Sequence, residues 1–401
     1  MQTAYALATP EKKTKYRRLA TTTSFVALCT YAVVYTITPA AINEIGQFYV
    51  ASTARLGWLF RVWMCGFFVA VLLTGIYSDR RGKLPSLLAG SIAMAFGLCL
   101  FAMSHSFNTA LLAVLIVGVG GGCVEGTSTA LLADLYSGSD RTSMMNLSQA
   151  FFGIGAVAGP MAVGYLLKTN VDWRLAYYGA AALSILNAIL AFGTFSLRME
   201  TPVQTHDSNC HVKGIFSNPL ILWLTLGMLF YVGAESGPAS WLAAYFKHDL
   251  HAAGWMAANS LAFFWGGILF GRVLGALVSR VMSDSCLLRW SIILAAVSQA
   301  ALLLMHSPIH GLVACATLGI CLGPIFPTIT SLAGAKYPEQ SGTVIGLAIA
   351  GASLGGVIFT PTIGWLASSI GMRHALWICI LALTANFIIV QIVSRKRRQP
   401  I

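Results

Sequence analysis

The sequence predicts an all-α membrane protein with twelve transmembrane helices in two pseudo-symmetric six-helix bundles. Of its 401 residues, 57% are hydrophobic and only 9% are charged, against about 25% charged residues in ordinary soluble domains. Apolar stretches recur along the whole chain, and each exceeds the roughly 18 residues that mark a transmembrane candidate. The third observation is an internal repeat, because motifs of the first half return about 200 residues later.

Each apolar stretch predicts one membrane span. In chain order the expected spans are 22–42, 56–78, 84–104, 108–135, 143–167, 174–197, 218–246, 254–280, 287–306, 309–335, 342–369 and 374–394. An even number of spans places both termini on one side of the membrane. Lys and Arg are in excess on that side, from the N-terminal EKKTKYRR to the C-terminal RKRR, so we expect both termini in the cytoplasm. This bias explains the net charge of +12, and nucleic acid is not an expected partner.

The repeat predicts the domain organisation. A polar stretch, RMETPVQTHDSNCHVKG, lies between the sixth and seventh spans. We therefore expect an N-terminal six-helix bundle in 1–197, a cytoplasmic linker in 198–217 and a C-terminal six-helix bundle in 218–401. GIYSDRRG begins at Gly75, and the related GALVSRVM begins at Gly275. Such duplicated halves predict a central site near the bilayer midplane at their interface.

The stretch GIYSDRRGK, residues 75–83, resembles the signature loop between helices 2 and 3 of the major facilitator superfamily. The resemblance covers nearly the whole chain and implies a transporter, not an enzyme. It implies gating roles for five residues: Gly75, Asp79, Arg80, Gly82 and Lys83. A plain basic turn is the alternative. Asp134 and Arg141 flank the loop between helices 4 and 5, as a cytoplasmic gating pair or as ordinary loop charges.

Three further stretches are similar to helices 7, 10 and 11 of the fucose:proton symporter family: YVGAESGPASWLAAYF, GPIFPTITSLAG and GASLGGVIFTPTIGWLA. By this resemblance Glu125 falls where that family carries a helix-4 carboxylate that takes part in proton coupling. The chain departs from the family pattern after Glu125, which continues EGTSTA without an Asn. It also has no acid in the first span, so we do not assign fucose as the substrate.

Glu125 lies well inside the fourth span. A charged carboxylate at a helix centre costs about 2.5–3.5 kcal/mol on insertion scales, so it needs a partner or a proton. Helical spacing places Gly121, Gly122, Ser128 and Thr129 on its face. Small and hydroxyl neighbours favour a water-filled cavity and proton coupling. The alternative is a neutral Glu that donates to a backbone carbonyl across a helix interface.

Glu235 is the second acid well inside a span, with Tyr231 one turn before it. We expect it to serve proton coupling, the substrate site or a gate. Trp241 and Tyr245 share a helix face; we expect Tyr245 in the interfacial aromatic belt, while Trp241 either joins that belt or stacks on a sugar.

Polar and aromatic residues inside the spans are the candidates for substrate binding. They are Ser128, Thr129, Asn146, Gln149, Tyr231, Trp241, Asn259 and Phe326. The Asn and Gln side chains could equally bond a neighbouring backbone.

Together these features predict a secondary active transporter that brings in a sugar or similar small polar solute with protons, or with sodium. We expect a monomer in a bacterial inner membrane, without cofactor or metal, since the HxxH of His248 and His251 lacks the other ligands of a zinc site. A proton-coupled exporter is one rival, because GAVAGPMAVG (155–164) partly resembles the helix-5 motif of drug:proton antiporters. A non-transporting membrane receptor on the same fold is the other.

Overall fold

The protein folds almost entirely into helices. The computed structural model describes residues 9–136, 138–197, 219–336 and 341–396, and within these ranges every regular element is a helix. The chain divides into two compact units, one of residues 1–38 and 62–206 and the other of residues 39–61 and 207–401. The short segment 39–61 therefore packs with the second half of the chain, although it belongs to the first half by sequence.

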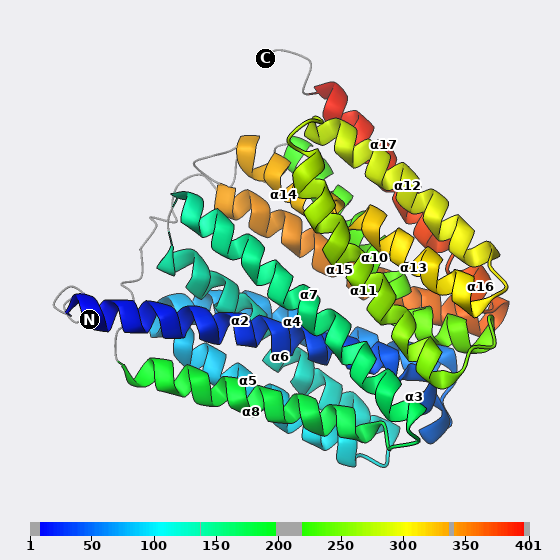
Figure 1. Ribbon diagram of the computed structural model, residues 1–401, viewed down its shortest axis with the longest axis horizontal. Coiled ribbons are helices and arrows are strands. Elements are labelled where there is room, and N and C mark those ends of the chain that lie inside the picture. The colour runs from blue at the N-terminus through cyan, green and yellow to red at the C-terminus, as the bar shows by residue number, and fades with distance from the viewer. Residues whose placement is uncertain (1–8, 137, 198–218, 337–340, 397–401) are drawn as a thin grey trace. The chain divides into compact units, whose positions relative to one another are not determined.

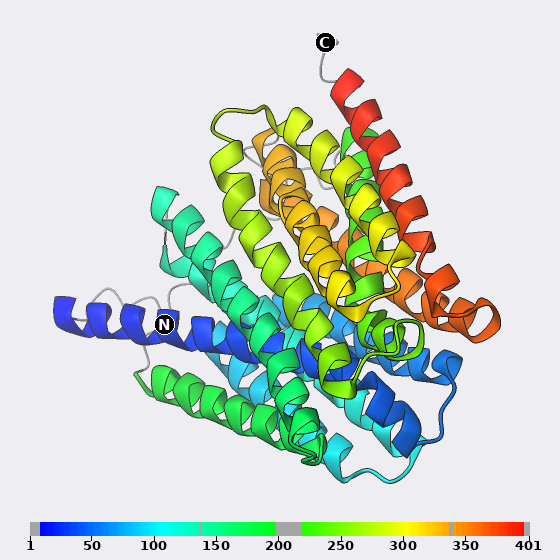
Figure 2. The ribbon, with the colours of Figure 1, turned by 45° about the vertical axis from the view of Figure 1, so that its right-hand side comes forward.

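The first unit contains six long helices. They are α2 (Pro10–Ala40) up to Thr38, α4 (Thr53–Arg81) from Val62, α5 (Lys83–Met103), α6 (Phe107–Leu135), α7 (Gly138–Lys168) and α8 (Arg174–Ser196). Within this unit α5 packs along α6 and along α8, and the α5–α8 pair can be followed in Figures 1 and 2.

The second unit contains the remaining helices and the segment 39–61. They are α3 (Ile42–Phe48), α10 (Pro219–His248), α11 (Gly254–Val278), α12 (Asp284–Leu304), α13 (Pro308–Leu322), α14 (Ile325–Lys336), α15 (Ser341–Ile370), α16 (Met372–Ala375) and α17 (Ile378–Lys396). Here α10 packs along α15 and α17, α11 along α13, and α12 along α17, the last pair lying side by side in Figures 1 and 2.

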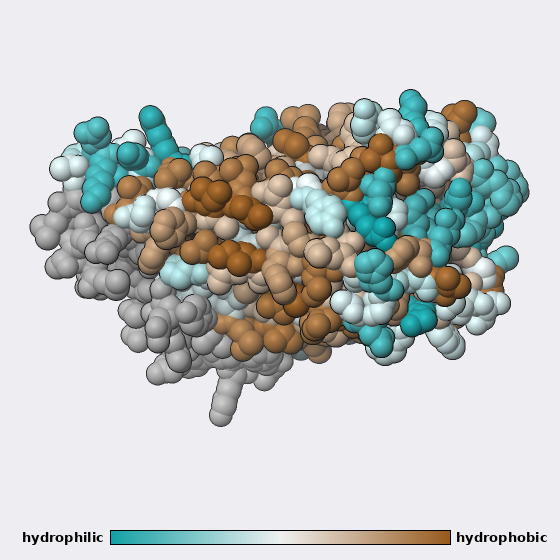
Figure 3. Space-filling view, turned by 90° about the horizontal axis from the view of Figure 1, so that it is seen from below, coloured by the Kyte–Doolittle hydropathy of each residue, from teal (hydrophilic) through white to brown (hydrophobic). Residues whose placement is uncertain are grey.

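Eleven of the described segments are long and apolar enough to cross a membrane. The twelfth long helix, α10, has 30 residues but carries Glu235 among its apolar residues. Large hydrophobic side chains such as Phe96 and Ile189 are exposed, and the face in Figure 3 shows a broad hydrophobic surface with hydrophilic residues gathered toward its ends. Such a surface is suited to lipid. The prediction of an all-α, multi-pass membrane protein is confirmed.

Two helices differ from their predicted spans. The first, α2, begins at Pro10 and not near residue 22, so the basic EKKTKYRR segment is helical. Proline suits the first turn of a helix because its missing N–H would have no partner there. The side chain of Thr9, just before the helix, caps it by accepting a hydrogen bond from the backbone N–H of Lys12 at 3.4 Å. The predicted span 309–335 is interrupted between α13 and α14, at Gly323 and Pro324, since proline removes a backbone donor.

The sequence repeat is also a packing repeat. A Cβ added to Gly118 of α6 would collide with the Trp63 carbonyl of α4, and one added to Gly319 of α13 would collide with the Phe264 carbonyl of α11. Both members of the second pair lie 201 positions after those of the first. A second set is related by 200 positions: Gly155 meets the Cys29 carbonyl, and Gly355 meets the Leu229 carbonyl. Small residues at these crossings let helix backbones approach closely within the membrane.

Candidate functional site

Glu125 lies on α6 and meets an aromatic cluster in the first unit. The Tyr31 hydroxyl of α2 hydrogen-bonds to the Glu125 carboxylate, and the Tyr31 ring is almost fully buried. Its centroid lies 5.8 Å from that of Phe67, 6.3 Å from that of Trp63 and 6.0 Å from that of Phe152. The tyrosine that bonds to the carboxylate therefore packs among aromatic rings of two further helices, α4 and α7.

The three glycines around Glu125 differ in how much space surrounds them. A Cβ at Gly121 would press on the Tyr31 ring at 3.1 Å, and one at Gly122 would meet the Phe67 carbonyl at 2.6 Å, so both glycines pack closely against other helices. The Cβ position of Gly126 has no atom within 4 Å. Open space therefore lies at Gly126, directly after Glu125. At Gly121 and Gly122, where we expected a water-filled face, atoms of neighbouring helices fill the space.

The hydroxyl residues after Glu125 differ in burial. Ser128 is fully buried, and its Oγ has no hydrogen-bond partner among the described residues. Thr129 is half-buried on the same helix. Ser128 therefore has unused hydrogen-bonding capacity about one turn after the acid, but its hydroxyl is not exposed in this conformation.

Glu235 lies on α10 of the second unit, and its carboxylate accepts a hydrogen bond from a tyrosine of the same helix. The Tyr231 hydroxyl, one turn earlier, donates to Glu235 Oε1 at 2.6 Å. The ring of Tyr231 is fully buried and lies 6.3 Å from the ring of Phe326 on α14. The positive charge of Arg272 on α11 acts on the Glu235 carboxylate. This acid thus has both a hydroxyl donor and a neighbouring positive charge.

Sequence reasoning did not include Arg272 among the site residues. It lies near the end of an expected span, where a basic residue usually reaches outward to the lipid headgroups. A signal was nevertheless present, because ionisable residues within membrane helices pair with one another. Glu235 is the acid well inside a span in the same half of the chain.

The remaining substrate candidates have local partners or no described side chain. Trp241 is fully buried, and its indole N–H donates to the Thr360 carbonyl at 2.8 Å. The Asn259 amide donates to the Trp255 carbonyl of its own helix at 2.9 Å. Gln149 is half-buried on α7. The side chain of Asn146, also on α7, lies outside the described part of the chain.

The gating candidates lie around the junction of α4 and α5. Gly82 has a φ of 93°, a conformation that glycine adopts readily, and it begins α5. Lys83 forms an ion pair with Asp134 at the end of α6 and also donates to the Ala130 carbonyl at 3.3 Å. Asp134 is therefore paired with Lys83. Four further candidates lie on α4 or α7, but their side chains are not among those described: Gly75, Asp79, Arg80 and Arg141.

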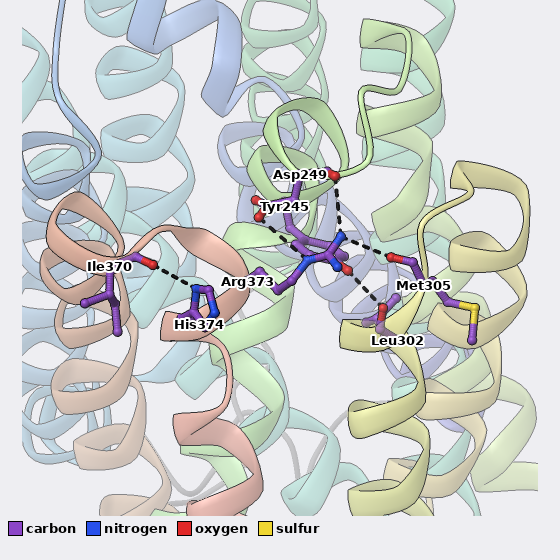
Figure 4. Close-up of polar contacts among 7 residues, drawn as sticks. All are labelled: Tyr245, Asp249, Leu302, Met305, Ile370, Arg373 and His374. Atoms are coloured by element: carbon purple, nitrogen blue, oxygen red, sulfur yellow. Dashed lines mark hydrogen bonds and ion pairs between the residues drawn. The ribbon is translucent and has the colours of Figure 1, made fainter.

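A polar cluster joins three helix ends of the second unit (Figure 4). Arg373 of α16 lies 3.9 Å from Asp249 and donates to the Met305 carbonyl at 3.1 Å. Tyr245 is fully buried, and its hydroxyl donates to the Leu302 carbonyl at 2.9 Å. The prediction that Tyr245 lies in a lipid-facing aromatic belt is therefore wrong. Its buried hydroxyl fixes the end of α10 to the end of α12.

No group of three or more His, Cys, Asp or Glu residues that could hold a metal occurs among the described residues. His248 and His251 lie at the end of α10 and just after it.

Comparisons with known proteins identify the family. The family model described as Major Facilitator Superfamily matches residues 23–349 and 236–400. The chain is 25% identical over 314 residues to the glucose/mannose transporter GlcP of Bacillus subtilis, covering 75% of this chain and 76% of that protein. It is 26% identical over 318 residues to a putative glucose/galactose transporter of Helicobacter pylori, covering 72% of this chain and 76% of that one.

Solved structures share the fold. The structure is similar to a bacterial homologue of the human lysosomal transporter Spinster, in an inward-facing and occupied conformation, with a TM-score of 0.78 and 16% identity over 96% of this chain and 99% of that chain. It is also similar to the E. coli fucose:proton symporter FucP, with a TM-score of 0.65 and 19% identity over 95% and 98% of the two chains. The family match, the membrane helices and the fold agree with the resemblance noted in residues 75–83. The chain belongs to the Major Facilitator Superfamily and is a membrane transporter, not an enzyme.

Proposed function

We propose that this transporter carries a sugar or similar small polar solute together with protons, by alternating access. The observation that supports this most strongly is the environment of Glu125. Its carboxylate lies inside a membrane helix and bonds to the Tyr31 hydroxyl, and the next residue along the helix, Gly126, has open space at its Cβ position. Among the residues that the structure describes, no basic side chain forms an ion pair with it.

Such a carboxylate is suited to carry a proton. A charge inside the membrane is costly unless it is paired, and Tyr31 supplies a hydrogen bond but no charge. Glu125 can reduce the cost by binding a proton and can release the proton when water reaches it. Glu235 is less suited to this role because Arg272 provides a permanent opposite charge.

The surroundings of Glu125 also favour a sugar as substrate. Trp63, Phe67 and Phe152 are half-buried rings around Tyr31, whose hydroxyl bonds to the acid. Aromatic faces stack on the C–H faces of sugars, while Ser128, Thr129 and the carboxylate can hydrogen-bond to hydroxyl groups. The names of the relatives agree with this class, since two are a glucose/mannose transporter and a putative glucose/galactose transporter.

The remaining features of the proposal follow from the sequence. We expect both termini in the cytoplasm because of the distribution of Lys and Arg, and we expect a monomer in a bacterial inner membrane. Protons are the expected coupling ion and sodium is the alternative.

The substrate class is tested by exchange in proteoliposomes. Purified protein is reconstituted with one unlabelled monosaccharide inside, and entry of the same labelled sugar is measured for glucose, mannose, galactose and fucose. We expect exchange of at least one sugar, and competition by its close analogues. If no monosaccharide exchanges while amphiphilic compounds are moved by the same protein, the chain is an exporter and the sugar assignment is wrong.

A further inference from the structure

A third acid, Glu44, lies in the first turn of a short helix outside the membrane-spanning segments and is half-buried. It lies on the short helix α3, between the candidate spans that end at Ala40 and begin at Thr53. Its Oε2 atom is buried and has no hydrogen-bond partner among the described residues. A buried carboxylate oxygen without a donor is unfavourable when charged, but it becomes acceptable when the group is protonated.

Helix α3 packs on α10 within the second unit. We call this packed arrangement the seated state of α3, and its loss the released state. Ile42 and Ile45 are fully buried, and the Asn43 side chain donates to the Ala243 carbonyl of α10 at 2.9 Å. The side chain of Leu56, in the first turns of α4, packs close to Gly46. The segment therefore packs on α10 with one buried hydrogen bond between them, and two of its apolar side chains are fully buried.

The charged groups around Glu44 lie on the two elements that pack against α3. Burial is the largest effect and raises the pKa of Glu44 above its ordinary value, while a hydrogen bond from its own backbone N–H and the positive charge of Lys247, in the last turn of α10, lower it. His248 is the other titratable residue in that last turn, and Arg55 is the charged residue at the start of α4.

We propose that Glu44 is a proton-binding site that controls the seating of α3 on α10. With the proton bound, α3 stays seated through the Asn43–Ala243 hydrogen bond. When the proton leaves, the buried charge favours release of α3 into water. With both termini in the cytoplasm, this end of the protein faces outside, so external pH sets the state of α3. Because α3 connects α2 to α4, the proton affects the ends of the helices that carry Tyr31 and Trp63.

The direction of the pH dependence follows from the raised pKa of Glu44. A carboxyl whose pKa is higher in the seated state than in the released state stabilises seating at low pH. This stabilisation is complete below the ordinary Glu pKa of about 4.3 and is lost as the pH rises through the raised value. The proposal goes beyond the transport function; its statement that α3 faces outside rests on the proposed orientation of the termini, whereas the pH dependence does not, and its test uses no substrate.

The test compares the labelling rates of two introduced cysteines. Ile45→Cys places a thiol at a fully buried position of α3, and Val50→Cys places one at a position that is 89% exposed in the same connection. Purified protein in nanodiscs is treated with a maleimide from about pH 4 to about pH 8, and each site is quantified by peptide mass spectrometry. Dividing by the rate at Val50→Cys corrects for the general rise of thiolate with pH, and a parallel series in the Glu44→Gln background isolates the contribution of Glu44.

We expect this ratio to be low at acid pH and to rise several-fold toward neutral pH. Glu44→Gln, which keeps the shape of the protonated acid, should keep the ratio low throughout. Lys247→Met should move the rise to higher pH without abolishing it, because the lysine lowers the pKa of Glu44. Asn43→Ala should raise the ratio at every pH and so confirm that labelling reports seating. A ratio that does not change with pH, or that rises equally in Glu44→Gln, would overturn the proposal.

Discussion

Two tyrosines at equivalent positions of the repeat serve two different acids. Tyr31 and Tyr231 are 200 residues apart, and each hydroxyl bonds to a carboxylate. In the first unit the acid, Glu125, comes from another helix. In the second unit the acid, Glu235, lies one turn along the same helix and is faced by Arg272. The tyrosine recurs at the offset of the repeat while the acid occupies a different position, and among the described residues a positive charge acts on the second acid alone.

This difference indicates different roles for the two acids. An acid that has only a hydroxyl partner gains most from binding a proton, whereas an acid with a cation beside it remains favourable when charged. Glu125 is therefore our candidate for the proton carrier. Glu235 is better suited to a structural ion pair or to a gate.

The largest expected effect separates the two acids directly. Glu125→Gln should abolish uphill accumulation of the substrate while exchange persists, because a permanently neutral side chain can no longer carry the proton. Glu235→Gln is the matched control and should retain accumulation. Labelled-substrate uptake into energised proteoliposomes, with exchange measured in parallel, provides the readout. If Glu125→Gln still concentrates substrate against its gradient, the acid is structural and the comparison between the units fails.

Uptake should differ less between variants of the two tyrosines than between variants of the two acids. Tyr31→Phe removes the hydrogen bond to Glu125, and a bond to a charged group contributes about 1.5–3 kcal/mol. We therefore expect the initial rate of proton-driven uptake to fall about tenfold. Tyr231→Phe should reduce it less, because Arg272 still acts on Glu235. Equal losses in the two variants would show that the tyrosines are interchangeable and would remove the asymmetry.

The smallest effect concerns stability. Arg272→Met leaves the Glu235 carboxylate without its positive neighbour, and an uncompensated polar group inside a protein costs about 1–3 kcal/mol. Thermal unfolding of the purified protein should therefore shift to lower temperature. The double variant Arg272→Met with Glu235→Gln should recover most of the loss, since no charge is then left unpaired. A double variant that is no more stable than Arg272→Met would show that the two side chains do not interact.

The helices, the repeat and the two deep acids could be predicted from the sequence. Apolar runs mark membrane helices directly, and an isolated Glu inside such a run is visible without a structure. Even the glycine crossings, such as Gly118 with Trp63, follow the same repeat offset as the motifs.

The partners of those acids could not be predicted. Tyr31 and Glu125 lie on different helices, and which side chains meet depends on how the helices rotate and pack. Trp241 shows the same limit, because the face that it shares with Tyr245 suggested a sugar-binding surface or an aromatic belt, and the sequence does not reveal that its indole is buried and bonds to the Thr360 carbonyl. Glu44 lies between the first two expected spans, where the apolar pattern does not reveal that α3 packs on α10.

Proton movement with the substrate is the most direct test of Glu125 as the proton carrier. Purified protein is reconstituted in liposomes that contain a pH-sensitive dye, and a panel of monosaccharides is added outside, one at a time. We predict that a transported sugar acidifies the interior of wild-type liposomes and that Glu125→Gln abolishes the signal while sugar exchange remains. Acidification that persists in Glu125→Gln, or sugar entry without any acidification in the wild type, would contradict it.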